Sequence, residues 1–433
     1  MNLRNESEPI GGWPRVPLKH ASRINPEVLS EDTPSGTEIE YVDIAALEGG
    51  AAADLTPKEL TFAAAPSRAR RVLRSGDTII STVRTYLRAV ANFPFVDSNL
   101  IASTGFAVLR PNGTLHPRFA YWAVLSEGFI QSVVAHSEGV SYPAISPTSL
   151  GQLPLTVPPL QLQERIANFL DEKTARIDAL IAEKETLLTS LEEFHRSTLW
   201  SLVTKGGSSK NLTDSGVEWI GDAPVSWKIT AIKWMTPVLR GASPRPIDDP
   251  KYFDEQGEYG WVRIADVSAS DGFLLSTEQR LSKLGESLSV KREPGDLFLS
   301  IAGTVGKPCI AGIKCCIHDG FVWFPAIDSN ALRGWLFAIF ESGFAYAGLG
   351  KMGTQLNLNT DTVGSIRVPV PPVEEMLRLL ERARKAKAAN LALQAHIQRH
   401  IDRLREYRSS LISAAVTGQL NIDDFQARQL EAA

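Results

Sequence analysis

The sequence is poor in cysteine and has no long apolar run. Three cysteines in 433 residues, Cys309, Cys315 and Cys316, are too few for a disulfide framework and indicate a reducing compartment. No window of about 18 uninterrupted apolar residues is present, so we expect no membrane-spanning helix and no membrane partner. Residues 1–9 are polar and acidic, and they lack the basic-then-apolar order of a signal peptide. These absences together predict a cytoplasmic protein.

Motifs that carry catalysis are also missing. The sequence contains no Asn-Pro-Pro-aromatic or Asp-Pro-Pro-Tyr motif for amino methylation, and no P-loop. Residues 348–353 fit G-x-G-x-x-G, but they follow an apolar helical stretch instead of a strand. The three cysteines and His318 lack paired C-x-x-C spacing, which favours buried strand cysteines over a zinc site. We therefore expect no catalytic residue, no metal site and no cofactor site in this chain.

The distribution of charge is uneven along the chain. The formal net charge is -4. Residues 58–118 contain nine basic and three acidic side chains, whereas residues 1–57 contain four basic and ten acidic ones. A local basic face can coexist with an acidic remainder, so the net charge neither supports nor excludes nucleic acid as a partner.

An internal repeat organises the chain. Residues 145–160 (ISPTSLGQLPLTVPPL) return as residues 358–373 (LNTDTVGSIRVPVPPV), and the same register later pairs Phe194 with Tyr407. Three weaker echoes lie upstream, between residues 13–19 and 227–233, 41–44 and 261–264, and 76–81 and 295–300. The order of parts is globular unit, helix, globular unit, helix, which indicates a duplication.

Each half ends in a long segment with helical character. Residues 160–205 and 373–417 contain no Gly or Pro, each follows a Pro-Pro pair, and Gly206 and Gly418 provide stops. Each helix would be about 68 Å long at 1.5 Å per residue. Apolar side chains recur every seven residues, which is typical of a coiled coil. The rows are Leu170, Ile177, Lys184, Leu191 with Leu180, Leu187, Phe194, and Asn390, Ile397, Leu404, Leu411 with Leu393, His400, Tyr407.

The two helices are expected to pair antiparallel, because each leaves one globular unit and returns the chain to the other. The polar members Lys184, Asn390 and His400 either fix the register or face solvent. The globular units mix strand-like runs at residues 78–83 and 296–301 with apolar helical stretches at 119–134 and 332–347. The predicted fold class is α+β: two globular domains in a pseudo-two-fold repeat, separated by two long antiparallel coiled-coil helices.

Three segments carry a family resemblance. They are residues 153–170 (LPLTVPPLQLQERIANFL), 411–418 (LISAAVTG) and the linker 214–227 (DSGVEWIGDAPVSW). With the duplicated layout, they make the chain similar to type I restriction–modification specificity subunits over nearly its full length. One departure is the start of the second helix, Val373-Glu-Glu-Met-Leu-Arg, where the first reads Leu160-Gln-Leu-Gln-Glu-Arg. In this family partner subunits dock on the two helices, and the departure puts the equivalence of the two docking surfaces in doubt.

The resemblance implies a domain order and a function. Residues 1–155 would be the first target recognition domain, 156–206 the central spacer helix, 207–368 the second target recognition domain, 369–420 the C-terminal spacer helix and 421–433 a tail. Such a subunit is not an enzyme: it reads a bipartite site in double-stranded DNA and docks two adenine methyltransferase subunits and restriction/translocase subunits on its helices. S-adenosylmethionine, ATP and Mg²⁺ would belong to those partners, and this chain would hold no cofactor.

Two other classes of protein remain as alternatives. A single-chain enzyme that cuts or methylates DNA would need the motifs that are missing here. A non-specific coiled-coil DNA scaffold or clamp would not need loops that differ between the two halves, and these loops do differ.

The first candidate DNA-reading loop is residues 81–88. It holds Arg84, Thr85, Tyr86 and Arg88 after a predicted strand. Arginine can bind guanine O6 and N7 with two hydrogen bonds, while Thr and Tyr hydroxyls reach phosphates or base edges. The resemblance adds that the family carries an Arg in this loop, so Arg84 is the leading candidate. The alternative is a solvated basic loop.

An arginine cluster precedes this loop. Arg68, Arg70, Arg71 and Arg74 either bind phosphates or line a surface helix, with Arg70 and Arg71 chosen as candidate DNA contacts.

The second unit offers two candidate loops. Residues 300–307 contain glycines that would let the backbone approach DNA, with Thr304 and Lys307 as contacts. Residues 351–357 supply Gln355 and Asn357, which could pair with adenine N6 and N7, although such residues also form turns. The further candidates of this loop and of its counterpart, residues 136–142, are Lys351, Thr354, Ser141 and Tyr142.

Overall fold

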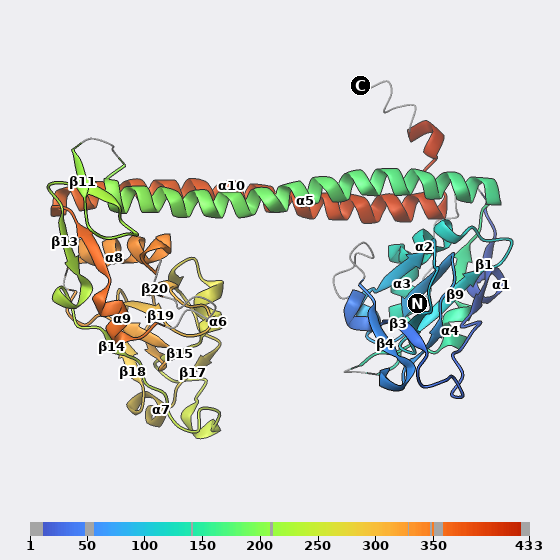
Figure 1. The fold of residues 1–433 in the computed structure, drawn as a ribbon, viewed down its shortest axis with the longest axis horizontal. Coiled ribbons are helices and arrows are strands. Elements are labelled where there is room, and N and C mark those ends of the chain that lie inside the picture. Colours follow the sequence, from blue (N-terminus) through green and yellow to red (C-terminus); the bar gives the residue numbers. More distant parts are fainter. Residues whose placement is uncertain are drawn as a thin grey trace. The chain divides into compact units, whose positions relative to one another are not determined.

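The chain divides into two compact units. The computed structural model describes residues 12–47, 56–139, 142–207, 211–327, 329–346, 349 and 358–425. Unit 1 comprises Met1–Glu185 and Arg399–Ala433, and unit 2 comprises Thr186–Gln398. Each unit therefore contains one globular part and a portion of both long helices, α5 (Leu160–Lys205) and α10 (Val373–Thr417) (Figure 1).

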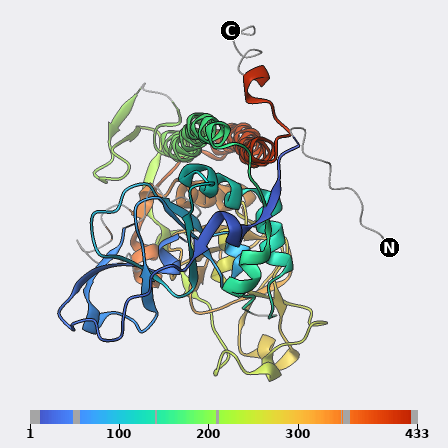
Figure 2. The same cartoon turned by 90° about the vertical axis from the view of Figure 1, so that its right-hand side faces the viewer.

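The two long helices have the bounds that the sequence predicts. Both begin directly after a Pro-Pro pair, and both end before a glycine with positive φ, Gly206 at +63° and Gly418 at +77°. A left-handed backbone conformation costs glycine little, which makes it a good helix stop. In unit 1, Arg408 on α10 donates to Asp178 on α5 at 2.8 Å. Both views show the two helices side by side, and Figure 2 shows them end on.

The two predicted heptad rows differ in burial. Leu170 and Ile177 are buried in the core of unit 1, whereas Leu180, Leu187 and Phe194 are 45%, 46% and 68% exposed. The same difference recurs on α10, where Ile397 and Leu411 are buried but Leu393 and Tyr407 are 46% exposed. One row thus forms the packed seam, and the other leaves apolar surface uncovered. In unit 2, Asn390 Nδ2 donates to the Leu191 carbonyl at 2.9 Å, so this polar residue contacts the neighbouring helix.

Unit 1 contains two four-stranded sheets. The first has the order β2-β9-β6-β7 and the second β4-β3-β8-β5, with β3 and β8 parallel and the other pairs antiparallel. Their bounds are β2 (Ser22–Ile24), β3 (Glu38–Val42), β4 (Lys58–Thr61), β5 (Ala69–Val72), β6 (Asp77–Ser81), β7 (Val90–Phe93), β8 (Leu100–Ser103) and β9 (Phe106–Pro111).

Unit 2 repeats this topology. Its sheets have the orders β14-β22-β19-β20-β16 and β17-β15-β21-β18, with β15 and β21 as the matching parallel pair. Only β16, which pairs parallel to β20, is additional in these orders. The bounds are β14 (Leu239–Arg240), β15 (Gly260–Val262), β16 (Phe273–Leu274), β17 (Gln279–Arg280), β18 (Val290–Arg292), β19 (Leu297–Ser300), β20 (Pro308–Ala311), β21 (Cys315–Ile317) and β22 (Phe321–Trp323). The duplication and the α+β fold class are confirmed.

Short strand pairs join the globular parts to the long helices. In unit 1, β1 (Arg15–Pro17) pairs with β10 (Pro154–Thr156), which directly precedes α5. In unit 2, β13 (Lys228–Ala231) pairs with β23 (Arg367–Val370), which directly precedes α10. A further pair, β11 (Leu212–Asp214) with β12 (Asp222–Pro224), follows the end of α5.

Helices pack the sheets against α5 and α10. The predicted helix at residues 119–134 is two helices, because Ser126 has extended φ and ψ angles of -62° and 145°. In unit 2, α8 ends where Gly343 takes a φ of +77°, earlier than expected. The shorter helices are α1 (Leu18–Ala21), α2 (Pro117–Leu125), α3 (Glu127–Ala135), α4 (Pro147–Gln152), α6 (Ile264–Ala269), α7 (Lys283–Ser287), α8 (Asn330–Ser342) and α9 (Thr360–Ser365). No helix among the described residues is long and apolar enough to cross a membrane.

Candidate nucleic-acid interface

The first candidate loop lies between β6 and β7 and has an unusual backbone. Arg84 and Arg88 flank a single 3-10 turn, Thr85–Leu87, and both have left-handed φ angles, +49° and +55°. Such angles are uncommon for residues other than glycine and cluster at functional sites. Thr85 is buried, and its hydroxyl lies 2.9 Å from the Ser137 hydroxyl. Thr85 therefore anchors the loop from within.

The structure brings a second predicted segment onto this loop. Val83 forms an isolated bridge with Ala144, and the Ile145 amide donates to the Thr82 carbonyl at 2.9 Å. The Arg84 guanidinium consequently lies 5.2 Å from the centre of the Tyr142 ring. Arg84 and Tyr142, two candidates from segments far apart in sequence, therefore lie together, and Tyr86 in the loop of Arg84 is half-exposed. Ser141 lies outside the described residues.

Arg88 is held by a carboxylate of the same unit. Its two terminal nitrogens donate to Glu127, at the start of α3, at 2.5 and 2.9 Å. The hydrogen bond from Arg88 lowers the pKa of Glu127. The Glu127 amide in turn donates to Ser413 on α10 at 3.2 Å, so the loop is connected through α3 to the long helix.

The arginine cluster lies on and beside a strand, so the surface-helix interpretation is wrong. Arg70 and Arg71 belong to β5, where pairing with β8 imposes an extended backbone. Arg68 donates to Asp43 at 2.7 Å and Arg74 to Glu27 at 2.9 Å. The acidic first segment thus neutralises part of the basic stretch that follows it.

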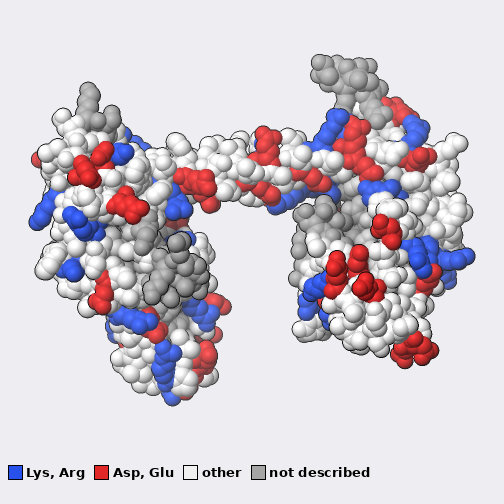
Figure 3. Space-filling model, in the orientation of Figure 1, with Lys and Arg blue, Asp and Glu red and all other residues white. Residues whose placement is uncertain are grey.

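Arg70 and Arg71 themselves have no carboxylate partner among the described residues. Arg70 lies 5.0 Å from the Phe62 ring centre, and burial lowers the pKa of the partly buried Arg71. These two side chains remain candidates for phosphate contacts. Figure 3 shows basic and acidic side chains interleaved on the visible face of both units, so no continuous basic surface covers the described part of that face.

The second candidate loop joins β19 to β20, and its polar side chains contact Ser268 of the same unit. Gly303 and Gly306 have φ angles of +64° and +84°, which reproduce the left-handed positions of Arg84 and Arg88. Thr304 Oγ1 lies 3.0 Å from Ser268 Oγ, and Lys307 Nζ donates to the Ser268 carbonyl at 2.8 Å. Burial lowers the pKa of Lys307.

The remaining candidates lie outside the described residues. They are Lys351, Thr354, Gln355 and Asn357, and the G-x-G-x-x-G segment at residues 348–353 is outside as well except for Leu349.

Two partners in this interface were not predicted from the sequence. Glu127 stands in an apolar helical stretch, and only the fold brings it to Arg88. The second partner is Ser268, which lies in an unpredicted short helix, α6, and contacts Thr304 and Lys307.

Comparison with known proteins shows which family the chain resembles. Residues 70–190 match the family described as "Type I restriction modification DNA specificity domain". A putative type I restriction enzyme MjaX specificity subunit from Methanocaldococcus jannaschii is 22% identical over 367 residues, covering 80% of this chain and 79% of the relative. A solved structure described as "Structural basis underlying complex assembly and conformational transition of the type I R-M system" is 25% identical with a TM-score of 0.73. It covers 95% of this chain and 100% of the other. Residues 70–190 thus carry the specificity domain, and the chain is similar over most of its length to type I restriction–modification specificity subunits.

A second solved structure agrees with the fold of this chain. The HsdS subunit from Thermoanaerobacter tengcongensis has a TM-score of 0.50 and 23% identity, covering 96% of this chain and 99% of the other.

The cysteines of this chain are buried strand residues, as predicted. Cys309 lies on β20, and Cys315 and Cys316 lie on β21, all as free thiols. Burial raises the pKa of Cys309 to about 11 and that of Cys316 to about 12, which keeps both thiols protonated near neutral pH. Within the described part of the chain, no group of three His, Cys, Asp or Glu side chains could hold a metal ion.

Proposed function

We propose that this chain is a specificity subunit that reads a bipartite site in double-stranded DNA, with one half-site read by each globular unit, and performs no chemistry itself. One observation carries the proposal: the two units repeat a single strand order but place different side chains in the equivalent loop. At matching left-handed positions, unit 1 has Arg84 and unit 2 has Gly303. A common scaffold with unlike contact residues is suited to reading two unlike sequences.

The domain and partner assignments follow from this proposal. Residues 1–155 and 207–368 form the recognition domains, residues 156–206 and 369–420 form the spacer helices, and residues 421–433 form a tail. Two adenine methyltransferase subunits, which bring S-adenosylmethionine, and restriction/translocase subunits dock on the helices. The exposed apolar side chains support this docking, Leu180 and Tyr407 in unit 1, and Leu187 and Phe194 in unit 2. Contiguous apolar surface that the chain leaves uncovered typically marks a contact surface.

Mapping of modified adenines tests the proposal. Host DNA is sequenced for modified adenine with and without this gene, in the presence of the cognate methyltransferase subunit. We expect modification at two short sequences separated by an unread gap of fixed length. Modification at one undivided motif would refute the bipartite assignment, and DNA binding without any sequence preference would favour the clamp alternative.

Lengthening both helices is expected to change the gap alone. Seven residues duplicated after Glu185 and seven after Gln398 keep the heptad register and add about 10 Å to each helix. The gap should lengthen by at most about three base pairs, since successive base pairs are about 3.4 Å apart. Sequencing of modified adenines reads out both gap and half-sites. Altered half-sites would contradict the role of the helices as spacers.

Exchanging the charges of Arg88 and Glu127 separates a positioning role from DNA contact. Arg88→Glu and Glu127→Arg, each alone, are expected to weaken binding to the half-site of unit 1 by about tenfold, because each places like charges together. The double variant restores the pair and should bind within about threefold of the wild type, measured by fluorescence anisotropy on DNA with one altered half-site. A double variant as weak as Arg88→Glu would mean that Arg88 contacts DNA directly.

A further inference from the structure

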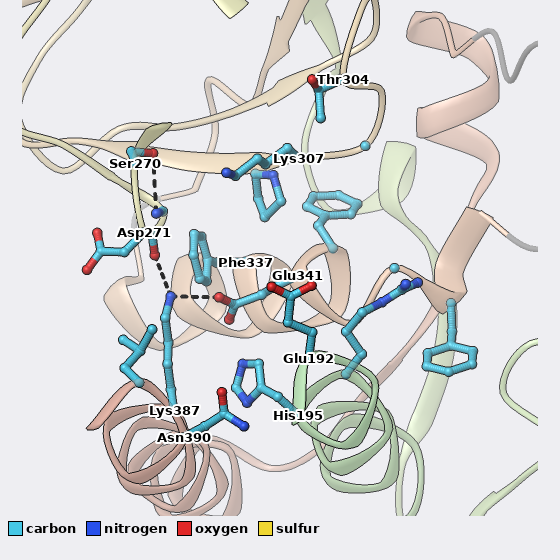
Figure 4. Close-up of a pocket in the computed structure, with 18 of the residues that line it drawn as sticks. Glu192, His195, Ser270, Asp271, Thr304, Lys307, Phe337, Glu341, Lys387 and Asn390 are labelled. Carbon is cyan, nitrogen blue, oxygen red and sulfur yellow. Dashed lines mark hydrogen bonds and ion pairs between the residues drawn. The ribbon is translucent and has the colours of Figure 1, made fainter. Parts of the chain in front are cut away.

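Unit 2 contains a cavity beside its candidate reading loop. It has a volume of about 950 Å³ and lies where the β19–β20 loop meets α8 and the helical segments of α5 and α10 that belong to this unit. Figure 4 shows Thr304 and Lys307 on one side, Phe337 and Glu341 of α8 behind, and His195 among the residues on the opposite side. Its volume falls in the range of small-molecule sites in proteins.

Aromatic side chains and polar side chains together line the cavity. Four aromatic side chains line it, namely Phe337, Phe340, Phe344 and Tyr346. Aromatic walls together with polar groups that can orient a ligand are typical of sites for small organic ligands. A flat ring is the shape that such walls pack against best.

Lys387 and Glu341 form an ion pair at the cavity, whereas Lys307, Glu192 and Asp271 form none among the described residues. Lys387 Nζ lies 2.6 Å from the Glu341 carboxylate and also donates to the Asp271 carbonyl, as the dashed lines in Figure 4 show. The Asp271 carboxylate itself points away from these groups in the same view. Lys307 donates to a neutral carbonyl, and none of the carboxylates in the described part of the chain forms an ion pair with it. A partly buried ammonium without a counter-ion is unfavourable.

The equivalent loop of unit 1 has a basic residue that is paired with a carboxylate. In unit 1 the Ser81 amide donates to the Ala89 carbonyl, and in unit 2 the Ser300 amide donates to the Lys307 carbonyl. Lys307 is therefore the equivalent of Ala89 and stands one position after the equivalent of Arg88. In unit 1, Arg88 is bound by Glu127 of the adjoining helix α3. In unit 2, the basic residue next to the equivalent position is Lys307, and none of the carboxylates that line the cavity forms an ion pair with it.

His195 adds a second unsatisfied group. Both nitrogens of its ring are shielded from solvent and have no hydrogen-bond partner among the described residues. Burial lowers its pKa, so the ring is neutral near pH 7 and offers one donor and one acceptor. Water can satisfy these nitrogens, but water cannot neutralise Lys307.

We propose that this cavity binds a small aromatic acid, whose ring packs against the phenylalanine walls and whose acidic group accepts a hydrogen bond from Lys307. Binding would draw Lys307 from the Ser268 carbonyl and so reach the loop that holds Thr304. An effect on the second half-site rests on the proposed function, whereas ligand binding itself does not.

The test uses the full-length chain without DNA. Isothermal titration calorimetry compares 2-naphthoate with 2-naphthylmethanol, which has nearly the same shape and no charge. We expect 2-naphthoate to bind with a dissociation constant of about 1 mM or lower, and the alcohol to bind at least about tenfold more weakly, since a charge-assisted hydrogen bond is lost. Lys307→Gln should abolish the preference for the acid, whereas the control Lys314→Gln, whose ammonium pairs with Glu258 elsewhere in the unit, should retain it.

A second variant covers the case in which Lys307→Gln does not fold. Leu391, on α10, lines the cavity and is 41% exposed, so Leu391→Trp narrows the cavity from its rim. It should weaken both probes, with circular dichroism confirming the fold. Three results would overturn the proposal: equal affinity for acid and alcohol, no binding of either probe, or binding that Lys307→Gln or Leu391→Trp leaves unchanged.

Discussion

Arg84→Ala is expected to lower affinity for one half-site by about tenfold to a hundredfold and to leave recognition of the other half-site intact. A bidentate arginine–guanine contact contributes about 1–3 kcal/mol of discrimination, which corresponds to this range. Arg84 has the geometry for such a contact, because its guanidinium lies against the exposed Tyr142 ring at the end of a strand. Anisotropy titrations with DNA substituted in either half-site measure the two effects separately.

Two further substitutions at the same position distinguish base reading from other roles. Arg84→Lys keeps the charge but loses the planar fork, so it should retain general DNA affinity and accept more sequences in that half-site. Arg84→Gly should lose recognition as Ala does, yet keep or raise the stability of unit 1 by up to about 1 kcal/mol, because glycine tolerates the +49° φ angle. An equal loss of affinity for every DNA sequence would show that Arg84 only contacts phosphate.

The repeat and the helices could be predicted because their signals are local. The absence of Gly and Pro from 160 to 205, with flanking Pro-Pro and Gly206, sufficed for both bounds of α5. Strands at residues 78–83 and 296–301 were confirmed as β6 and β19, since their apolar side chains are buried on both faces. By contrast, one heptad row proved exposed, because periodicity shows that apolar positions share a face without showing what covers it.

Tertiary contacts explain what the sequence could not predict. The arginines around β5 looked like a helical or phosphate-binding cluster, but pairing with β8 and ion pairs from the first 47 residues gave them a structural environment. Similarly, Arg88 was proposed as a DNA contact on residue type alone, and its Glu127 partner depends on how α3 packs beside the loop. Which of these loop residues touch DNA stays a prediction, to be decided by the variants above.

Asp77→Ala is expected to destabilise unit 1 by about 3 kcal/mol or more. The Asp77 side chain is fully buried; it accepts two hydrogen bonds from Arg110, at 2.9 and 2.8 Å, and one from the Arg74 amide at 2.8 Å. Removal leaves the guanidinium of Arg110, itself only 24% exposed, without its main counter-ion, and breaking a buried ion pair in this way costs about 3–5 kcal/mol. Chemical denaturation of the full-length chain measures the loss as an earlier unfolding transition.

The repeat supplies a matched control for this prediction. Asp296 follows Gly295 as Asp77 follows Gly76, and it accepts from the Glu293 amide at 3.0 Å as Asp77 accepts from Arg74. Its carboxylate is 33% exposed and contacts Arg292 at 3.2 Å, so solvent screens this ion pair more than the pair of Asp77 with Arg110. Asp296→Ala should therefore cost clearly less than Asp77→Ala, about 1–2 kcal/mol from the lost turn contact. Equal losses would show that the contribution of this aspartate to stability comes from the turn that both units share. The buried ion pair would then not determine it.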